Sequence, residues 1–338
     1  MKVLSLSPTG NGAHVVHSLI AKHLNDYTSV GYSPWITLMP YLLSHLGKNH
    51  RASIVHAPLD YACFFKRDGV PLIATAHNFV LDDFMRNYST RLQRLHYQTD
   101  LAYFTRRSLD MASCVTAVSN YTAAIIRSEM SYASPIPVIY NGIDETAFTP
   151  KIKKSDISKR KIFRILFSGN LTLRKQFAVL PKLAETLGAG FEIVCAGGLN
   201  SKVLRENGFS DAEAITYLGR VPYEEMPAVY NSVDALFMPS VREGFGLAVV
   251  EAMACGLPVV ANNCSSIPEL FQDKEGGFLC EVGNLSQYVD AFRALSDDER
   301  LCHRMGGVNR GQVEKKFTLS RMVSEYQCLF EKVCDNNV

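Results

Sequence analysis

The chain has 338 residues, which is enough for about two domains that each bury a core of their own. Hydrophobic residues make up 47% and charged residues 20%, as in ordinary globular proteins, and the formal net charge is +2. This balance gives no general argument for nucleic-acid binding, so any electrostatic function must be local. The nine cysteines are scattered and odd in number, which favours reduced thiols in a cytosolic protein over a disulfide framework.

The hydropathy of the chain predicts no segment that enters a membrane. The first twelve residues lack the apolar core of a signal peptide, and no apolar run reaches the ~18 residues of a spanning helix. We therefore expect a cytoplasmic protein, and attachment to the inner face of a membrane stays open. Neither a Cys-x-x-Cys pair nor a His/Cys cluster indicates a metal site.

The N-terminal part reads as alternating strands and helices. A strand at Met1–Leu6 is followed by a glycine turn with Gly10 and Gly12, and then by a helix to Leu24. This is the phosphate-binding start of a doubly wound α/β domain, although the glycine spacing is not G-x-G-x-x-G. A nicotinamide dehydrogenase is therefore a weak interpretation. Further strands are predicted at 53–56, 72–76, 114–118 and 137–140.

Two features of this half are candidates for ligand contact. His77 comes directly after the predicted strand 72–76, at the strand end where ligands of parallel sheets bind. It can equally hydrogen-bond a neighbouring loop. Between residues 86 and 107, arginines alternate with aromatic residues, which suits an anionic or lipid-linked acceptor or a membrane surface. A solvated helix face with aromatic core contacts explains the same pattern.

The second half begins after residues 150–161, a basic and polar segment without periodicity that reads as an exposed linker. A strand at Phe163–Ser168 leads into Gly169, then into Arg174 and Lys175 at the predicted start of a helix. Cations are disfavoured at that end of a helix dipole unless an anion lies beside them. Both are therefore candidates to bind a diphosphate. The alternative is that both point into solvent.

The stretch Val241–Ala261 has the most specific pattern in the chain. It places Glu243 ahead of a glycine turn and Glu251 within an otherwise small and apolar helix. A buried carboxylate needs hydrogen-bond donors, which the two hydroxyls of a ribose would supply. Free N–H groups at the helix start, around Gly246, would suit a phosphate or sugar oxygen. A buried helix with its glutamate satisfied by a backbone amide is the simpler interpretation, and it leaves Glu243 and the glycines unexplained.

This stretch resembles the signature of the retaining glycosyltransferases of family 4, which contains two glutamates, with seven residues between them, inside an E-G-F-G-L…E-A-M-A-x-G-x-P-V pattern. Ile267–Leu270, the Asn-Gly-Ile-Asp sequence at 141–144, and the segment 217–222 are also similar to that family. The resemblance covers essentially the whole chain. It implies an α/β protein of the GT-B architecture, with two facing Rossmann-like domains and a cleft between them.

The resemblance also implies that the two domains bind different substrates. Residues 1–150 would form the acceptor-side domain, with a C-terminal helix at about 321–338 packing back on it. Residues 151–320 would bind the nucleotide sugar. The residues it assigns to catalysis are His77, Arg174, Lys175 and Glu243, and those it assigns to the donor are Gly10, Gly12, Gly169, Arg220, Val221, Phe245, Gly246, Leu247 and Glu251.

The implied reaction is transfer of a sugar from a nucleotide diphosphate sugar, with UDP or GDP as the expected nucleotide, to a hydroxyl acceptor. The acceptor would be a glycan, a lipopolysaccharide or a lipid-linked intermediate. Because no two aspartates form an Asp-x-Asp motif, we expect no metal and no cofactor. Two other classes stay open: a nucleotide-sugar epimerase of the same fold, and a binding protein without turnover.

Overall fold

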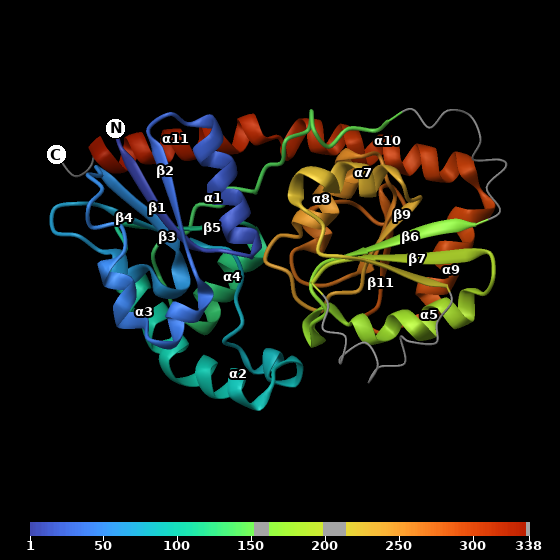
Figure 1. Ribbon diagram of the computed structural model, residues 1–338, viewed down its shortest axis with the longest axis horizontal. Coiled ribbons are helices and arrows are strands. Elements are labelled where there is room, and N and C mark those ends of the chain that lie inside the picture. Colours follow the sequence, from blue (N-terminus) through green and yellow to red (C-terminus); the bar gives the residue numbers. More distant parts are fainter. Residues whose placement is uncertain (152–161, 199–213, 336–338) are drawn as a thin grey trace. The chain divides into compact units, whose positions relative to one another are not determined.

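The structure is a computed structural model that describes residues 1–151, 162–198 and 214–335 (Figure 1). It divides the chain into two compact units. Unit 1 comprises Met1–Gly142 and Phe317–Val338, and unit 2 comprises Ile143–Lys316. All but the first two residues of the predicted linker at 150–161 lie outside the described residues.

Unit 1 contains a five-stranded sheet in the order β2-β1-β3-β4-β5, with neighbouring strands parallel. This is the flavodoxin-like variant of the doubly wound fold, and its strand order reverses between β1 and β3. The strands are β1 Val3–Pro8, β2 Tyr27–Tyr32, β3 Ile54–Pro58, β4 Leu72–Ala76 and β5 Cys114–Ala117. The helices are α1 Gly12–His23, α2 Arg91–His96, α3 Ala102–Met111, α4 Asn120–Glu129 and α11 Leu319–Asp335.

Two details of this sheet differ from the sequence prediction. The edge strand β2 was not predicted, because its middle residues are partly exposed and it has no continuous apolar run. The strand predicted at 137–140 was wrong: the structure has an isolated bridge there, between Ala117 and Val138.

The C-terminal helix α11 completes the core of unit 1. Its buried Phe330 lies against the rings of Tyr27 and His56, with centroids 6.0 and 5.5 Å apart. Phe330 of the last helix thus packs against residues of β2 and β3. Separate segments of the chain therefore share one hydrophobic core.

Unit 2 contains a six-stranded parallel sheet in the order β11-β10-β9-β6-β7-β8, which is the strand order of dinucleotide-binding α/β domains. The order reverses between β6 and β9. The strands are β6 Phe163–Ser168, β7 Phe191–Ala196, β8 Ile215–Gly219, β9 Ala235–Met238, β10 Val259–Asn262 and β11 Gly277–Cys280. The helices are α5 Leu180–Leu187, α7 Met226–Asn231, α8 Leu247–Ala254, α9 Leu285–Asp297 and α10 Glu299–Lys316.

Helix α10 packs closely against the end of α8. A Cβ atom added at Gly306 would lie 1.9 Å from the carbonyl oxygen of Gly256, two residues after α8 ends. Only glycine permits this approach of helix to backbone. The contact matters for the site described below because α8 carries Glu251.

Substitution of Gly306 by alanine should therefore destabilise unit 2 by about 1–3 kcal/mol, since the added methyl forces two backbones apart. Gly307 is the matched control, because it lies on the same helix with open space around its Cβ direction. Gly307→Ala should be neutral or stabilise by up to about 1 kcal/mol through helix propensity. Urea unfolding of both variants measures the difference. Equal stabilities would contradict the packing described here.

Candidate active site

The candidate site of unit 2 lies where its strand order reverses. The segment after β6 carries Arg174 and Lys175, and the segment after β9 carries Glu243. Strands β6 and β9 are hydrogen-bonded neighbours, so both segments leave the same edge of the sheet side by side. In doubly wound α/β proteins, ligands bind outside the carboxyl ends of the strands at this switch point.

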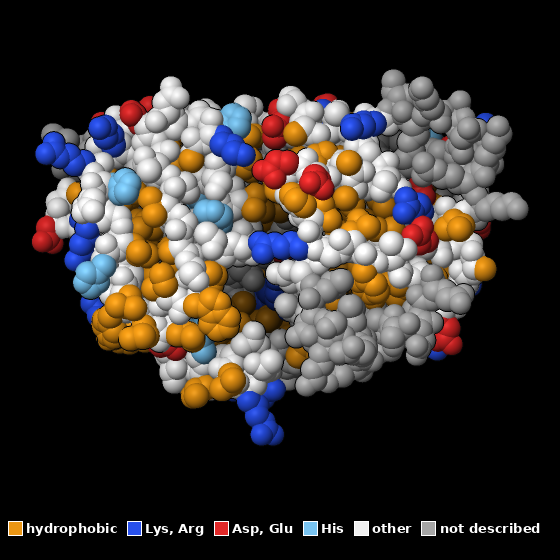
Figure 2. Space-filling model, viewed as in Figure 1, with side chains coloured by type: hydrophobic (Ala, Val, Ile, Leu, Met, Phe, Trp, Pro, Cys, Tyr) orange, Lys and Arg blue, Asp and Glu red, His pale blue; other side chains and the backbone are white. Residues whose placement is uncertain are grey.

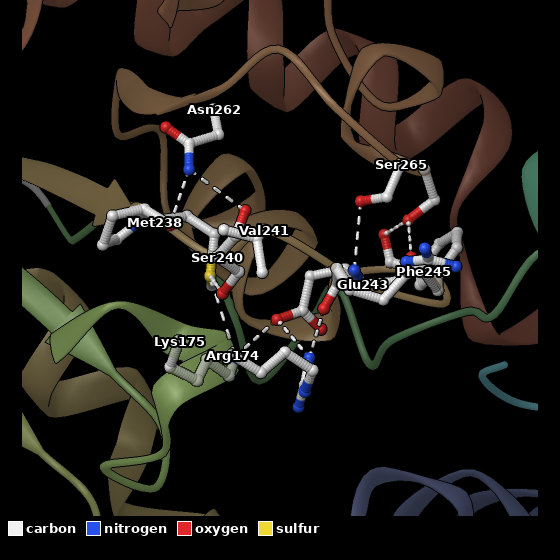
Figure 3. Close-up of polar contacts among 12 residues, drawn as sticks. Arg174, Lys175, Met238, Ser240, Val241, Glu243, Phe245, Asn262 and Ser265 are labelled. Carbon is white, nitrogen blue, oxygen red and sulfur yellow. Dashed lines mark hydrogen bonds and ion pairs between the residues drawn. The ribbon is translucent and has the colours of Figure 1, made fainter. Parts of the chain in front are cut away.

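The central feature of the site is an ion-pair cluster (Figure 3). Glu243 Oε1 lies 3.0 Å from Nη1 of Arg174 and 2.9 Å from Nζ of Lys175. Burial alone would raise the pKa of Glu243, but the charges of Lys175 and Arg174 outweigh burial and lower it to about 2. Glu243 is therefore ionised at neutral pH. Two cations and one carboxylate leave the cluster with one net positive charge.

The predicted helix start at Arg174 and Lys175 was wrong. Both belong to a 3-10 turn, Leu173–Lys175, that ends at Gln176 in the left-handed region at φ 49°, and α5 begins only at Leu180. The two cations are therefore not at the start of α5. The anion that compensates them is the Glu243 carboxylate, which the sequence analysis had assigned to catalysis.

A second glycine contact shapes the segment that carries the cations. Gly169 has a φ of +134°, and a Cβ there would lie 3.1 Å from Cε of Lys175. The lysine side chain thus lies over the glycine and reaches Glu243. Gly169 is placed to give Lys175 room, and any contact of its own with a ligand stays a prediction.

Serines after β10 fix the backbone of the glutamate segment. The N–H of Glu243 donates to Oγ of Ser265 at 3.0 Å. The hydroxyl of Ser266 lies 3.0 Å from the carbonyl oxygens of both Glu243 and Phe245. The amide of Asn262 donates to the carbonyl of Pro239 at 2.6 Å. Sequence reasoning missed these three side chains, because serine and asparagine after a strand are typical of any turn.

Helix α8 begins four residues after Glu243, at Leu247. Gly246 precedes it with a φ of 101°, a conformation that favours glycine, and no side chain caps this end. Because the first N–H groups of a helix have no acceptor within it, Gly246 and Leu247 are suitably placed for an anion or a sugar oxygen. Phe245 is buried directly before this turn.

Glu251 lies on α8 and is only 6% exposed. Its Oε2 accepts a hydrogen bond from the hydroxyl of Tyr230 on α7 at 2.8 Å. Burial raises the pKa of Glu251 to about 7, although the Tyr230 hydrogen bond and the charge of Lys175 act against it. The expectation that this carboxylate needs a donor was sound, but the structure supplies a tyrosine hydroxyl that no motif had indicated.

The remaining donor-site candidates of unit 2 lie farther along the sheet. Arg220 is exposed and Val221 is half-buried on the segment that follows β8, two strands away from β6. The structure shows no bond between either residue and the ion-pair cluster. Their role at a nucleotide base stays a prediction.

In unit 1, the glycine turn after β1 matches its sequence interpretation in geometry. Gly10 has a φ of 81°, and Gly12 is the first residue of α1. The side chain of Asn11 caps that helix by accepting from the N–H of His14 at 3.0 Å. Neither glycine is shown to contact a ligand.

His77 follows β4 and belongs to a chain of buried hydrogen bonds. Its Nε2 lies 3.1 Å from Nε2 of His17 on α1. Nδ1 of His17 lies 2.7 Å from the hydroxyl of Ser5 and 2.8 Å from that of Tyr27. The Tyr27 hydroxyl in turn lies 2.8 Å from Nδ1 of His56. This row of hydrogen bonds fixes Nε2 of His77. The other ring nitrogen, Nδ1, is buried with no hydrogen-bond partner in the described structure.

The three histidines of this network stay neutral. Burial lowers the pKa of His56 to about 3 and that of His77 to about 4, and His56 and His77 add to the burial that lowers the pKa of His17 well below its usual value. Sequence analysis found only His77, because His17 and His56 lie in a helix and a strand where nothing marks them as partners.

Within the described residues, no group of three His, Cys, Asp or Glu side chains is arranged to hold a metal ion. Every helix described is too short or too polar to cross a bilayer. All nine cysteines are free.

Two doubly wound units of this kind form the GT-B fold of glycosyltransferases, and solved structures show the same architecture. Sucrose-phosphate synthase from Thermosynechococcus elongatus matches with a TM-score of 0.79 at 15% identity, over 98% of this chain and 99% of that one. Anabaena HepE in complex with UDP-glucose also gives 0.79, at 19% identity, over 98% and 100%. At such identities the likeness shows the fold, and it confirms the predicted fold class.

Family models assign both halves of the chain. Residues 148–311 match "Glycosyl transferases group 1", and residues 2–147 match "Glycosyltransferase Family 4". The chain therefore belongs to the group 1 glycosyltransferases of family 4, as its motifs had indicated.

Curated relatives carry the names of several different activities. N-acetyl-alpha-D-glucosaminyl L-malate synthase of Bacillus anthracis is 23% identical over 92% of this chain and 82% of the relative. D-inositol 3-phosphate glycosyltransferase of Paenarthrobacter aurescens is 29% identical over 70% and 61%. A GDP-mannose-dependent mannosyltransferase of Mycobacterium tuberculosis is 25% identical over 65% and 63%. The alignments thus span less than two thirds of the latter two relatives.

The histidine network predicts how unit 1 responds to acid. In the unfolded chain, histidines take up protons near pH 6.5, whereas His17, His56 and His77 stay neutral in the folded unit. The unfolded state then binds more protons, so stability should fall as pH drops below about 6.5, by about 2 kcal/mol per group at pH 5. Hydrogen exchange of β1, β3 and β4, corrected for intrinsic rates, measures this loss between pH 7.5 and pH 5.

His56→Gln should weaken this pH dependence, because it removes one of the three groups. The matched control is His303→Gln on α10, where the histidine side chain is 69% exposed and pairs with Glu299. This control should leave the pH dependence of unit 1 unchanged. Equal protection of unit 1 at the two pH values would show that the histidines are not held neutral.

Proposed function

We propose that this protein is a retaining glycosyltransferase that moves a hexosyl group from a nucleotide diphosphate sugar to a hydroxyl acceptor without a metal ion. The observation that carries the proposal is the cluster of Arg174, Lys175 and Glu243 at the switch point of unit 2. Its net positive charge, at the strand ends where nucleotides bind in this fold, suits the diphosphate of the donor.

Three parts of the site would share the donor. Arg174 and Lys175 bind the diphosphate, and the N–H groups at the start of α8 support the diphosphate and sugar. Glu251 accepts hydrogen bonds from the ribose hydroxyls. Its Oε2 is already held by Tyr230, which orients the carboxylate for a diol. Because the pKa of Glu251 is about 7, its charged, accepting form increases as pH rises through neutrality.

The chemistry requires the bond between the anomeric carbon and the diphosphate oxygen to break while the acceptor oxygen bonds to that carbon. Negative charge then develops on the leaving diphosphate, where Arg174 and Lys175 stabilise it. The acceptor proton passes to a phosphate oxygen, as front-face attack with retention requires. A double displacement through Glu243 is disfavoured, because two ion pairs and a pKa of about 2 make its carboxylate a weak nucleophile.

Relatives support the donor class. One is named as GDP-mannose-dependent, and HepE was solved with UDP-glucose. We therefore propose a UDP- or GDP-sugar donor, and a glycan, lipopolysaccharide or lipid-linked acceptor in the cytoplasm. His77, with one ring nitrogen held and the other without a partner, is proposed to contact the transferred sugar. A nucleotide-sugar epimerase would instead consume the donor without an acceptor, and a binding protein would not turn it over.

The experiment that tests the proposal is calorimetric titration with UDP, GDP, ADP and their sugars, with and without magnesium. Lys175→Met keeps side-chain length but removes a charge-assisted hydrogen bond worth about 1.5–3 kcal/mol. The affinity for the preferred diphosphate should fall about 10- to 100-fold, while the affinity for the matching nucleoside stays the same. Lys182→Met is the control, because Lys182 is exposed on α5 and pairs only at the surface.

Glu243→Gln separates binding from turnover. Removing the carboxylate leaves both cations available to the diphosphate, so nucleotide affinity should hold or rise, whereas sugar transfer should fall at least tenfold. We propose that Glu243 acts on the transferred sugar. If the variant lost nucleotide affinity together with transfer activity, that role would be contradicted. NMR of the anomeric proton in the product tests retention, and turnover of the donor without acceptor would favour the epimerase.

A further inference from the structure

Exposed large hydrophobic side chains are concentrated in one part of unit 1. Of the fifteen exposed large hydrophobic residues that the structure describes, nine lie between residues 35 and 103. Those of unit 2 are spread widely along the chain, as single exposed hydrophobics ordinarily are. The nine are Trp35, Leu38, Met39, Tyr41, Leu42, Phe84, Leu92, Leu95 and Tyr103.

Four of the nine belong to two 3-10 turns, Pro34–Leu38 and Pro40–His45, which follow strand β2, and a fifth, Met39, lies between the turns. Trp35 is 79% exposed, Tyr41 71% and Leu38 70%. Only Leu43 of these turns is fully buried and anchors them to the core. The turns therefore present their large apolar side chains outward, which costs free energy in water.

Ring contacts join these turns to helix α3. Tyr41 packs edge-on against Phe104, with centroids 6.1 Å apart, and Phe104 lies 5.2 Å from Tyr103. The guanidinium of Arg107 lies 5.9 Å from the centre of the Tyr103 ring. We call Trp35, Leu38, Met39, Tyr41, Leu42 and Tyr103 the apolar platform. Figure 2 shows hydrophobic side chains gathered at the lower left of unit 1.

Basic residues outnumber acidic ones in the sequence around the platform, although Asp83, Asp100 and Asp110 lie near it along the chain. No acidic residue occurs between Asp26 and Asp60, the interval that contains both turns. The stretch from Phe84 to Thr99, which includes α2, has three arginines and no acidic residue. On α3, Arg106 and Arg107 are exposed. Exposed tryptophan, tyrosine and leucine beside arginines match the interface of a bilayer with anionic headgroups, where aromatic rings lie at headgroup depth.

We propose that the apolar platform docks unit 1 on an anionic lipid surface. Trp35, Leu38 and Tyr41 enter the interfacial layer, and Arg106 and Arg107 contact lipid phosphates. The inference stands on exposure and charge alone and does not depend on the proposed reaction. It favours the membrane surface among the interpretations of residues 86–107, and it adds the turns at 34–45, which sequence analysis had not singled out.

Trp35 makes the test direct, because it is the only tryptophan in the chain. Vesicles of equal parts phosphatidylcholine and phosphatidylglycerol should shift its fluorescence emission to shorter wavelength and sediment with the protein. Pure phosphatidylcholine vesicles should bind at least about tenfold more weakly, and added salt should weaken binding to the anionic vesicles. No shift and no co-sedimentation with anionic vesicles would overturn the proposal.

Leu38→Ser combined with Tyr41→Ser should reduce binding to the anionic vesicles about tenfold. The matched control combines Val282→Ser with Val308→Ser, two exposed hydrophobics of unit 2, and should bind like the unchanged protein. Circular dichroism and thermal unfolding, measured on both variants, report that they are folded. Equal loss in the two variants, or a concentration-dependent shift of Trp35 emission without vesicles, would contradict the proposal, the latter by indicating self-association.

Discussion

The pairing of one carboxylate with two cations at the switch point of unit 2 is the interaction on which the functional account depends. Glu243 lies between Arg174 and Lys175 because parallel β6 and β9 are neighbours whose following segments leave the same sheet edge. The ion pairs keep Glu243 ionised and leave one positive charge uncompensated. The same contact explains why Gly169 must lack a side chain and why Ser265 and Ser266 brace the glutamate backbone. A diphosphate that binds there competes with the glutamate for the cations.

Unit 1 stabilises its buried polar side chains in another way. Its buried polar groups are neutral: three histidines, one tyrosine and one serine satisfy one another through a chain of hydrogen bonds between α1, β1, β2 and β3. His77 is the end of that chain and keeps one unpartnered nitrogen. Such a network costs little where its members are satisfied, as all but Nδ1 of His77 are, and it fixes ring orientations firmly. The two units thus stabilise buried polar groups by opposite means, charge pairing in one and neutral hydrogen bonds in the other.

The sequence predicted the doubly wound fold well, because strands such as 72–76 and 163–168 are largely apolar and a glycine follows the second of them. It also singled out Glu243, Glu251, Arg174 and Lys175 as candidate site residues, since charges in such positions need partners. It could not predict which partners they have. Tyr230 lies 21 residues before Glu251 and carries no motif. The 3-10 turn at Leu173–Lys175 replaced a predicted helix because Gln176 adopts a left-handed conformation that no residue pattern signals. Nor did any residue pattern mark His17 and His56 as members of the hydrogen-bond network that includes His77.

A crystal structure with the nucleoside diphosphate that binds most tightly tests the central claim most directly. The account predicts β-phosphate oxygens within hydrogen-bond distance of Arg174 and Lys175, the ribose hydroxyls on Glu251, and the phosphates beside the first turn of α8. A nucleotide bound elsewhere in unit 2, with both cations still bonded to Glu243 and facing no phosphate, would contradict it.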